Sequence, residues 1–388
     1  MMQATTETCS PQALRWLHDL VQYQTVSGSE SNLALLEQVE AFLSARGFEV
    51  RYTHSADGKR ANLYARLGTS KEGGIMLSGH TDVVPVSGQN WSRAPFAVTE
   101  EVDRLYGRGV CDMKGYLAAV LAVVERIDAR TLSLPLHVAF TYDEEIGCLG
   151  VRGLLRDLAN EGIRPAACIV GEPTSMKVVR AHKGRHSWRC TVQGQAAHSS
   201  TAGLGVNAAE VAARLVAEIS GQALHLQTSN RDEGFYVPYS TMATCRIHSG
   251  TATNVIPEEA EFDFDLRYLP GVEPEMVLNP IHLRARALQD EMQSRVQSSR
   301  IKLERRTEVP ALVPENSTDD IVTRIVKAGG NLGGHVAYTT EGGLYQAQGI
   351  PTVVCGPGDI AQAHTADEFI LKSEIGACEA VLARLLSN

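Results

Sequence analysis

Hydrophobic and polar positions follow two different periods along this chain. Between 11 and 47, apolar residues such as Leu14, Leu17 and Val21 recur at helical spacing, and Gly47 ends the pattern. The next part alternates continuous apolar runs of strand length with helical patterns. We expect strands at 48–52, 63–67, 75–78, 136–142 and 167–170, and helices at 115–127 and 151–159. Helices that alternate with strands apolar on both faces predict an α/β fold with a mostly parallel sheet.

The pattern changes after about residue 181 and changes back after 310. We expect strands at 187–192, 242–248, 262–268 and 301–306, and helices at 206–219 and 275–292. Phe262, Phe264 and Leu266 alternate with Asp263 and Asp265, which is typical of a sheet with one solvated face. The order β-α-β-β-α-β indicates a ferredoxin-like α+β module. Beyond 310 the first pattern returns, with a helix at 319–327, a strand at 352–355 and a helix from 372.

The composition argues against several classes of protein. A chain of 388 residues is long for one core, so two domains are expected. The formal charge of −9 argues against nucleic-acid binding, and no apolar run approaches the about 18 residues that span a bilayer. The first ten residues lack the basic start and apolar stretch of a secretory signal. Eight scattered cysteines without a CxxC pair favour free thiols, so we expect a cytoplasmic protein.

Ionisable side chains follow the predicted strands at the points where those strands end. They are His80, Asp82, Asp112, Glu144, Glu145, Glu172 and His364. Chemistry collects at the carboxyl ends of strands in an open α/β sheet. Histidines and carboxylates without a thiolate are the ligand set of a catalytic pair of divalent ions, zinc first, with cobalt as the alternative. Because His364 must complete a site that begins at His80, we expect 1–181 and 309–388 to form one catalytic domain, with 182–308 inserted.

Two of these residues have simpler interpretations when each is taken alone. A single histidine after a strand, such as His80, is more often structural than a metal ligand. Asp82, two residues further on, favours the ligand, because a carboxylate can orient a metal-bound imidazole. Asp112 is the one acid of the glycine-rich loop 107–115, where it could cap a helix or bridge two metal ions. The choice for Asp112 depends on the other acids.

Three successive acids, Asp143, Glu144 and Glu145, end an apolar strand. They would repel one another if they faced inward without a cation, so the alternative is an exposed acidic turn. Glu172 ends another strand in the same way, and this pairing favours the metal site. Adjacent residues point in different directions, so one of Glu144 and Glu145 can bind metal while the other faces the attacking water.

These motifs resemble those of a known family. The segments 78–85, 107–115, 143–145, 171–174 and 253–257 are similar to the metallohydrolases that include acetylornithine deacetylase, succinyl-diaminopimelate desuccinylase and aminoacylases. Thr340-Glu341-Gly342 and 355–364 resemble the acetylornithine deacetylase branch. Desuccinylases usually carry Gly-Gly-Thr-Ser-Asp-Gly where this chain has Thr-Thr-Glu-Gly-Gly at 339–343, which counts against that branch.

The resemblance assigns a role to each acid and histidine at the strand ends. It implies that His80, Asp112 and Glu172 bind one metal ion, while Asp112, Glu145 and His364 bind the other. Glu144 would be the general base and acid, and Asp82 the partner that supports His80. The first and last segments would then form a dinuclear metallohydrolase domain, and 182–308 a lid that also forms a homodimer.

The resemblance also points to residues away from the strand ends. His198 would stabilise the tetrahedral oxyanion in the site of a partner subunit. Arg267 would bind the substrate α-carboxylate through a two-point contact, and Asn254, in the preceding loop, would also bind substrate. Glu341 would either favour a cationic substrate side chain or support the site structurally, and both roles stay open.

The expected activity is metal-dependent hydrolysis of the N-acetyl amide of acetylornithine to ornithine and acetate, in arginine synthesis. The nearest alternatives share the mechanism and differ in the small N-acyl-amino acid substrate, as in a succinyl-diaminopimelate desuccinylase or an acetylcitrulline deacetylase. An alternative of another class is a non-catalytic amino-acid-binding scaffold. Such a scaffold should have lost a ligand or the base, and the sequence retains all of them.

Overall fold

The computed structural model describes residues 8–128, 132 and 134–387 in two compact units. Unit 1 comprises Met1–Ala181, Leu312–His335 and Thr340–Asn388, and unit 2 comprises His182–Ala311 and Val336–Thr339. Residues 1–7, where we expect no secretory signal, lie outside the described part. Within the described ranges, no helix is both long and apolar enough to cross a membrane.

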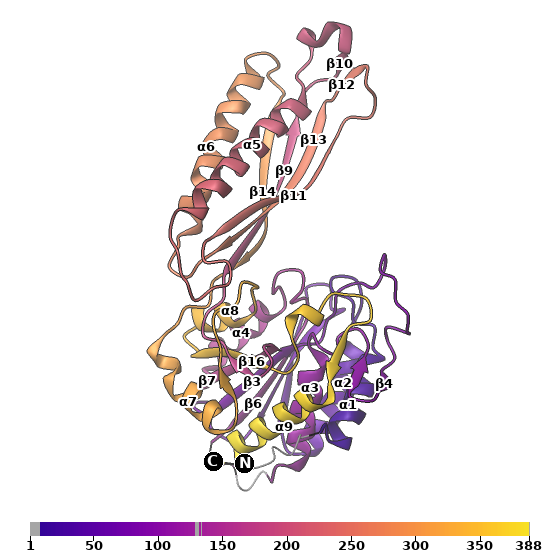
Figure 1. The fold of residues 1–388 in the computed structure, drawn as a ribbon, viewed down its shortest axis with the longest axis vertical. Helices are drawn as coiled ribbons and strands as arrows, with labels where there is room; N and C mark the ends of the chain where they lie inside the picture. Colours follow the sequence, from indigo (N-terminus) through magenta and orange to yellow (C-terminus); the bar gives the residue numbers. More distant parts are fainter. Residues whose placement is uncertain (1–7, 129–131, 133, 388) are drawn as a thin grey trace. The chain divides into compact units, whose positions relative to one another are not determined.

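Unit 1 is built on a six-stranded sheet (Figure 1). Its strands, in spatial order, are β1 (Glu49–His54), β2 (Ala61–Leu67), β6 (Leu136–Thr141), β3 (Ile75–His80), β7 (Ala167–Pro173) and β16 (Thr352–Gly356). The four strands from β6 to β16 are parallel, and β1 and β2 form an antiparallel edge. The predicted α/β fold with a mostly parallel sheet is therefore confirmed.

Helices cover both faces of this sheet, as the apolar strands predicted. They are α1 (Pro11–Val21), α2 (Leu33–Ala45), α3 (Lys114–Arg126), α4 (Val151–Glu161), α7 (Asp319–Lys327), α8 (Gly342–Ala347) and α9 (Lys372–Leu386). Ile75 and Leu77 of β3 join the core that α3 and α9 build on one face. Ser78 points to the other face, where its hydroxyl lies 2.8 Å from the Tyr345 hydroxyl of α8. Both faces are thus buried, which explains why these strands lack polar alternation.

Short strands of unit 1 were not expected from the sequence. β17 (Phe369–Leu371), β5 (Arg104–Tyr106) and β4 (Thr99–Glu101) form a three-stranded sheet, and β15 (Asn331–Leu332) pairs with β8 (Lys177–Val178). The 3-10 turns η3 (Asn316–Thr318) and η4 (Ile360–Gln362) also belong to unit 1. Segments of two or three residues carry too little periodicity to be predicted. Antiparallel pairing of β5 with β17 joins chain segments near 105 and 370, so the loops that follow β5 and precede β17 meet.

Unit 2 has the order β-α-β-β-α-β of the predicted ferredoxin-like module. Its main elements are β9 (Gly184–Gln193), α5 (Ala208–Gln227), β11 (Thr241–Ser249), β13 (Glu259–Tyr268), α6 (Pro274–Gln293) and β14 (Arg300–Val309). The antiparallel sheet has the order β11-β13-β9-β14, and α5 and α6 cover one of its faces (Figure 1). β10 (Ala197–His198) pairs with β12 (Val255–Ile256), and the 3-10 turn η2 (Ser199–Leu204) directly follows β10.

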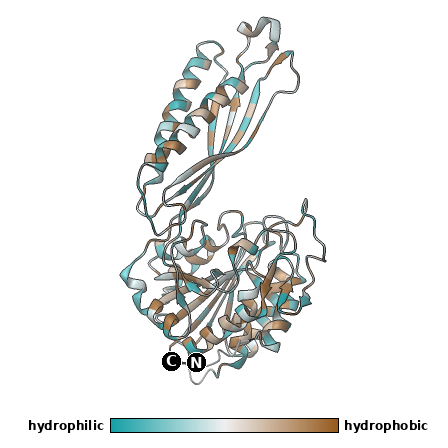
Figure 2. Ribbon diagram, in the orientation of Figure 1, coloured by the Kyte–Doolittle hydropathy of each residue, from teal (hydrophilic) through white to brown (hydrophobic). Residues whose placement is uncertain are grey.

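The other face of the unit 2 sheet is solvated, as the alternating pattern of β13 predicted. Phe262 and Phe264 are buried in the core beneath the helices. Asp263 and Asp265 point the opposite way and pair with arginines of the neighbouring strand β9, Arg189 with Asp263 and Arg185 with Asp265. Figure 2 shows this alternation of apolar and polar residues along the strands.

The boundaries of the inserted unit differ from the expected 182–308. The segment 309–311 belongs to unit 2, because Val309 continues the pairing of β14 with Arg185 of β9. The segment 336–339, which was expected in the catalytic domain, also belongs to unit 2. Val336 forms a β-bridge with His182, and the Thr339 hydroxyl donates a 2.8 Å hydrogen bond to the Lys183 carbonyl. A segment as short as 336–339 shows no hydrophobic period from which its place in unit 2 could be predicted.

Candidate metal centre

The histidines and acids predicted as ligands gather at one end of the unit 1 sheet. β3 ends at His80, β7 carries Glu172, and the turn after β6 carries Glu145. Asp112 lies just before α3, and His364 lies between η4 and β17. Parallel strands end at the same edge of the sheet, so the sequence order brings these distant residues together.

One candidate ligand group consists of His80, Asp112 and Glu172. His80 Nε2 lies 3.0 Å from Asp112 Oδ1 and 3.7 Å from Glu172 Oε1. All three side chains are buried. One imidazole nitrogen and two carboxylates converge on a small volume, which is a suitable donor set for a zinc-sized ion.

The second candidate group consists of Asp112, Glu145 and His364. His364 Nε2 lies 3.2 Å from Asp112 Oδ2 and 2.9 Å from Glu145 Oε1. Asp112 thus presents Oδ1 to the first group and Oδ2 to the second. This arrangement suits a carboxylate that bridges two ions, and it disfavours the simpler role as a helix cap, since the N-cap of α3 is Met113.

The electrostatics of the site call for cations. Burial, reinforced by the charge of Asp112, raises the pKa of Glu172, and the same causes raise the pKa of Glu145 to about 7. Hydrogen bonds to Asp112 and Glu145 raise the pKa of His364 to about 10. The two raised acid pKa values favour protonated Glu172 and Glu145, and the raised pKa of His364 favours its charged form. Divalent ions would take the place of these protons, so the residues present fit a metal pair.

Hydrogen bonds orient the His80 ring. Its Nδ1 lies 2.9 Å from the Asp82 carbonyl oxygen, so Nδ1–H donates there and Nε2 offers its lone pair to the site. The Asp82 carboxylate is further away, with Oδ1 3.6 Å from Nδ1. Support of His80 by residue 82 therefore comes first from the main chain, whereas the sequence pointed to the carboxylate.

The Asp82 carboxylate instead holds the acidic turn. Its Oδ1 accepts a 3.2 Å hydrogen bond from the backbone N–H of Glu144, and its Oδ2 accepts one of 3.3 Å from that of Glu145. The Ser27 hydroxyl donates a further hydrogen bond of 2.6 Å to Oδ2. Asp82 thus fixes the direction of the two neighbouring glutamates. Ser27 carried no sequence signal, because it lies far from the strand ends in an unpatterned segment.

Glu144 lies in the same turn as Glu145 and is nearly buried. Burial, with the charges of neighbouring acids including Glu145, raises the pKa of Glu144 to about 8, against the opposing charge of His80. The Cys148 thiol donates to Glu144 Oε1 over 3.3 Å. A carboxylate with a raised pKa beside candidate metal ligands is suited to accept a proton and return it.

Glu341 is as buried as His80, with 1% of its surface exposed. Burial and then the charge of Glu144 raise the pKa of Glu341 to about 8, against the opposing effect of Thr141. Among the described residues, no group makes a well-formed hydrogen bond to either Glu341 oxygen. Glu341 therefore lies in the acidic end of unit 1 rather than on its surface.

The remaining predicted site residues belong to unit 2. His198 and Asn254 lie together, since β10 pairs with β12 and the Asn254 carbonyl accepts a 3.0 Å hydrogen bond from Ser199 N–H. The backbone N–H of Ser200 donates to His198 Nδ1 over 3.1 Å, so the ring hydrogen lies on Nε2 when Nδ1 accepts this bond. The His198 side chain is exposed.

Arg267 lies on the solvated face of the unit 2 sheet. Its Nε donates to Asp265 Oδ1 over 2.8 Å, and its Nη1 donates to the Thr339 hydroxyl over 3.1 Å. The side chain is 30% exposed. These two contacts hold the guanidinium plane in place while part of the group stays open to solvent.

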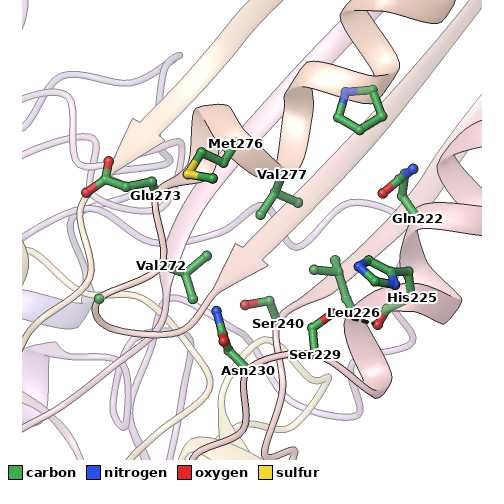
Figure 3. A pocket seen from close by; sticks show the side chains of 12 residues that line it. Gln222, His225, Leu226, Ser229, Asn230, Ser240, Val272, Glu273, Met276 and Val277 are labelled. Atoms are coloured by element: carbon green, nitrogen blue, oxygen red, sulfur yellow. Dashed lines mark hydrogen bonds between the residues drawn. The ribbon is translucent and has the colours of Figure 1, made fainter.

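A cavity of about 340 Å³ lies in unit 2, at one end of α5 and α6 (Figure 3). Its lining includes His225, Ser240, Glu273 and Met276. It contains none of the predicted site residues, and the candidate ligand groups lie in the other unit.

The fold and the site define a metal-dependent hydrolase. A family model described as Peptidase family M20/M25/M40 matches residues 76–388. The chain belongs to this family. Acetylornithine deacetylase of Aliivibrio salmonicida is 32% identical over 97% of this chain and 98% of its own. That of Proteus mirabilis is 36% identical over 92% of this chain and 90% of its own.

Solved structures have the same fold at lower identity. An M20 family metallo-carboxypeptidase of Sulfolobus solfataricus matches with a TM-score of 0.78 and 18% identity, covering 97% of this chain and 99% of its own. A Bacillus subtilis protein described as a dinuclear metal binding peptidase matches with a TM-score of 0.67 and 17% identity, covering 97% and 96%. These likenesses concern the fold alone.

Proposed function

We propose that the protein hydrolyses the N-acetyl amide of N2-acetylornithine to ornithine and acetate, with two zinc ions per chain. The observation that carries this proposal is the Asp112 carboxylate, whose two oxygens face two separate ligand groups. The curated relatives named acetylornithine deacetylase, which match nearly end to end, support the choice of substrate. Cobalt is the alternative metal, because the same oxygen and nitrogen donors suit it.

In this proposal, five residues of unit 1 bind metal and Glu144 transfers a proton. His80 and Glu172 would hold one ion, Glu145 and His364 would hold the other, and Asp112 would be shared between the two groups. The bound ions would polarise the acyl oxygen and lower the pKa of the attacking water. Glu144 accepts the proton of that water as the C–O bond forms. It then donates the proton to the amine nitrogen as the C–N bond breaks.

His198 would donate its Nε2–H to the oxyanion that develops on the acyl oxygen. Its ring is suited to this role, because Ser200 occupies Nδ1 as a hydrogen-bond donor. We propose that this histidine acts in the site of a second copy of the chain, in a homodimer formed through unit 2. The exposed edge strand β11, with Ile247 52% exposed, supports a contact through this unit.

Recognition of the amino acid would depend on Arg267, Asn254 and Glu341. Arg267 is held by Asp265 and Thr339, so its planar fork is ordered before a carboxylate binds. Glu341 would favour the ammonium of ornithine, since it is an acid without a well-formed hydrogen bond from any described residue. We place the reaction in arginine synthesis in the cytoplasm, where the eight free thiols would stay reduced.

A panel of small N-acyl-amino acids tests the proposal. The metal-free protein would be loaded with zinc or cobalt, and release of acetate or succinate would be measured for acetylornithine, acetylcitrulline, acetylmethionine and succinyl-diaminopimelate. We expect the highest kcat/KM for acetylornithine. A higher value for the succinyl compound or for acetylcitrulline would replace the proposed substrate. Binding without any turnover at full metal loading would identify a non-catalytic scaffold.

A further inference from the structure

Glu368 is a buried acid that belongs to neither candidate ligand group. Its side chain is 1% exposed. The carboxylate accepts hydrogen bonds from the backbone N–H groups of Gly109 at 3.1 Å, Cys111 at 2.9 Å and Asp112 at 3.1 Å. Three donors of one loop therefore converge on a single side chain. Glu368 fixes the shape of the loop that presents Asp112.

Arg108 connects Glu368 to Gln89 by hydrogen bonds. Its guanidinium is 1% exposed, and Nη1 donates to Glu368 Oε2 over 2.7 Å. The other arm, Nη2, donates to the side-chain oxygen of Gln89. The guanidinium carbon lies 5.0 Å from the centre of the Trp91 ring, which packs against its plane. A rigid planar group thus joins Glu368 to Gln89 at a fixed spacing.

Gln89 completes the connection to the second half-site. Its Nε2 donates a 2.7 Å hydrogen bond to the His364 carbonyl oxygen. Trp91 Nε1 donates over 3.0 Å to Gln89 Oε1, which orients the amide. His364 has a φ of +61°, a left-handed conformation that is uncommon outside glycine and costs free energy. Such a conformation persists where the surrounding contacts hold it, and Gln89 supplies one of these contacts.

The backbone explains why the two loops lie within reach of this chain of hydrogen bonds. β5 and β17 pair in antiparallel fashion, and the Gly107 N–H donates a 3.0 Å hydrogen bond to the Glu368 carbonyl. The loop that leads to Asp112 leaves β5, and the loop that carries His364 enters β17. One short sheet therefore holds the origins of both loops, and the side chains of Glu368, Arg108 and Gln89 connect them further out.

We propose that Gln89 and Glu368, joined through Arg108, are positioning residues that set the spacing between Asp112 and His364. The proposal rests on the two-ion centre proposed above, in which Asp112 and His364 share one ion. None of the three residues belongs to a candidate ligand group. Their effect should therefore appear in metal binding at the His364 group, and only through it in turnover.

Gln89 is the residue to change, because it is partly exposed and its loss leaves the buried Arg108–Glu368 pair intact. Chelator-treated Gln89→Ala would be titrated with zinc by calorimetry against a competing chelator. We expect the second equivalent to bind about 10–100-fold more weakly and the first to bind as in the wild type. Gln89→Glu, which can still accept from Arg108 but cannot donate to the His364 carbonyl, should show the same loss.

Two further variants make the result specific. His364→Ala identifies which equivalent belongs to its group, and adding Gln89→Ala to it should leave the remaining equivalent unchanged. Ser92→Ala is the matched control, since Ser92 lies in the same segment as Gln89 and its hydroxyl donates a 2.8 Å hydrogen bond to Asp367 Oδ2, in the loop that carries His364. We expect wild-type affinity for both equivalents in this control. With cobalt, only the absorption of the second equivalent should change in Gln89→Ala.

Each other outcome has a definite meaning. Wild-type affinity for both equivalents in Gln89→Ala would overturn the positioning role and leave the proposed two-ion enzyme standing. An equal loss in Ser92→Ala would attribute the effect to general tethering of the loops and would also overturn it. Uptake of fewer than two ions by the wild type would overturn the proposed function, and this inference with it. Thermal unfolding of the metal-free proteins would show that each variant is folded.

Discussion

Asp112 turns one carboxylate oxygen toward His80, with Oδ1 3.0 Å from the His80 Nε2. Its other oxygen is thereby free to serve the His364 group, where the Nε2 lies 3.2 Å away. This geometry predicts that Asp112→Ala weakens both ions, whereas Glu172→Ala and His364→Ala each mainly empty one position. Metal content after dialysis at a fixed free zinc concentration, measured by mass spectrometry, would check this. Loss of a single equivalent in Asp112→Ala would exclude the bridging role.

Glu144 is predicted to move protons rather than to bind metal. Glu144→Gln preserves size and removes the basic oxygen, so turnover should fall about 10²–10⁴-fold or more while both ions remain bound. Steady-state kinetics together with metal analysis of the same sample would check this. Glu30→Gln, at an exposed position, is the control and should keep normal kinetics. If Glu144→Gln loses one ion and recovers activity when metal is restored, Glu144 is a ligand.

The fold could be predicted wherever elements were long and periodic. The continuous apolar strands gave the parallel sheet, and the alternating Phe262-Asp263-Phe264-Asp265 gave the solvated face of the inserted unit. The short strands β5 and β17 could not be predicted, because three residues do not establish a period. Their pairing is what brings the Asp112 and His364 loops together, so this part of the site had no local signal.

The candidate site could be predicted for residues whose chemistry is unusual in their position. Successive acids at the end of an apolar strand, such as Glu144 and Glu145, are difficult to explain without a cation, so the sequence alone identified them as candidate site residues. Supporting residues gave no such signal. Gln89 and Glu368 are ordinary polar residues in the sequence, and their roles come from hydrogen bonds to main-chain atoms that only the folded chain brings close.

Buried His137 predicts part of the dependence of stability on pH. Its Nε2–H donates a 3.0 Å hydrogen bond to the Gly73 carbonyl, and the Tyr64 hydroxyl lies 2.6 Å from Nδ1. Burial lowers the pKa of His137 from 6.5 to about 4. As pH falls, His137 is therefore protonated in the unfolded chain before it is protonated in the folded one. Its contribution to the free energy of unfolding is present above pH 6.5 and is lost as pH falls toward 4.

The size of that loss is on the order of 3 kcal/mol in the free energy of unfolding. His137→Gln should lower stability at neutral pH and weaken the decrease between pH 6.5 and 4. Urea unfolding of the metal-free protein at several pH values would measure both effects. His54→Gln, at an exposed histidine, serves as the control and should follow the wild type. Parallel pH profiles for His137→Gln and the wild type would contradict the assignment.

His198 is predicted to act on the substrate of a partner subunit. His198→Ala should lower kcat by about 10²–10³-fold, as expected for loss of one oxyanion donor, with both ions retained. Mixing this variant with Glu144→Gln tests the arrangement. A heterodimer contains one site with an intact Glu144 and an intact His198 from its neighbour, so activity should return as subunits exchange. Failure to recover after exchange has been verified by mass spectrometry would count against action between subunits.

Glu341 is predicted to select the side chain of the substrate. A buried acid without a well-formed hydrogen bond from any described residue should gain most from an ammonium that reaches it. Glu341→Gln keeps the shape and removes the charge. The kcat/KM for acetylornithine should therefore fall more than that for acetylmethionine, whose side chain is neutral. The difference should correspond to about 1–3 kcal/mol of transition-state stabilisation. Kinetics on both substrates with the same metal-loaded sample would measure this difference.

Comparing the two substrates also shows whether Glu341 selects the substrate or supports the structure of the site. If Glu341 only shapes the acidic end of unit 1, both substrates lose kcat/KM equally, because the defect lies in the enzyme. Arg267→Lys is the matched variant, since lysine cannot reproduce the planar two-point contact with an α-carboxylate. Every N-acyl-amino acid carries that carboxylate, so Arg267→Lys should lower kcat/KM equally for both substrates. Glu341→Gln should lower kcat/KM more for acetylornithine than for acetylmethionine. Equal losses in Glu341→Gln would assign the residue to structure and leave the choice of acetylornithine to other contacts.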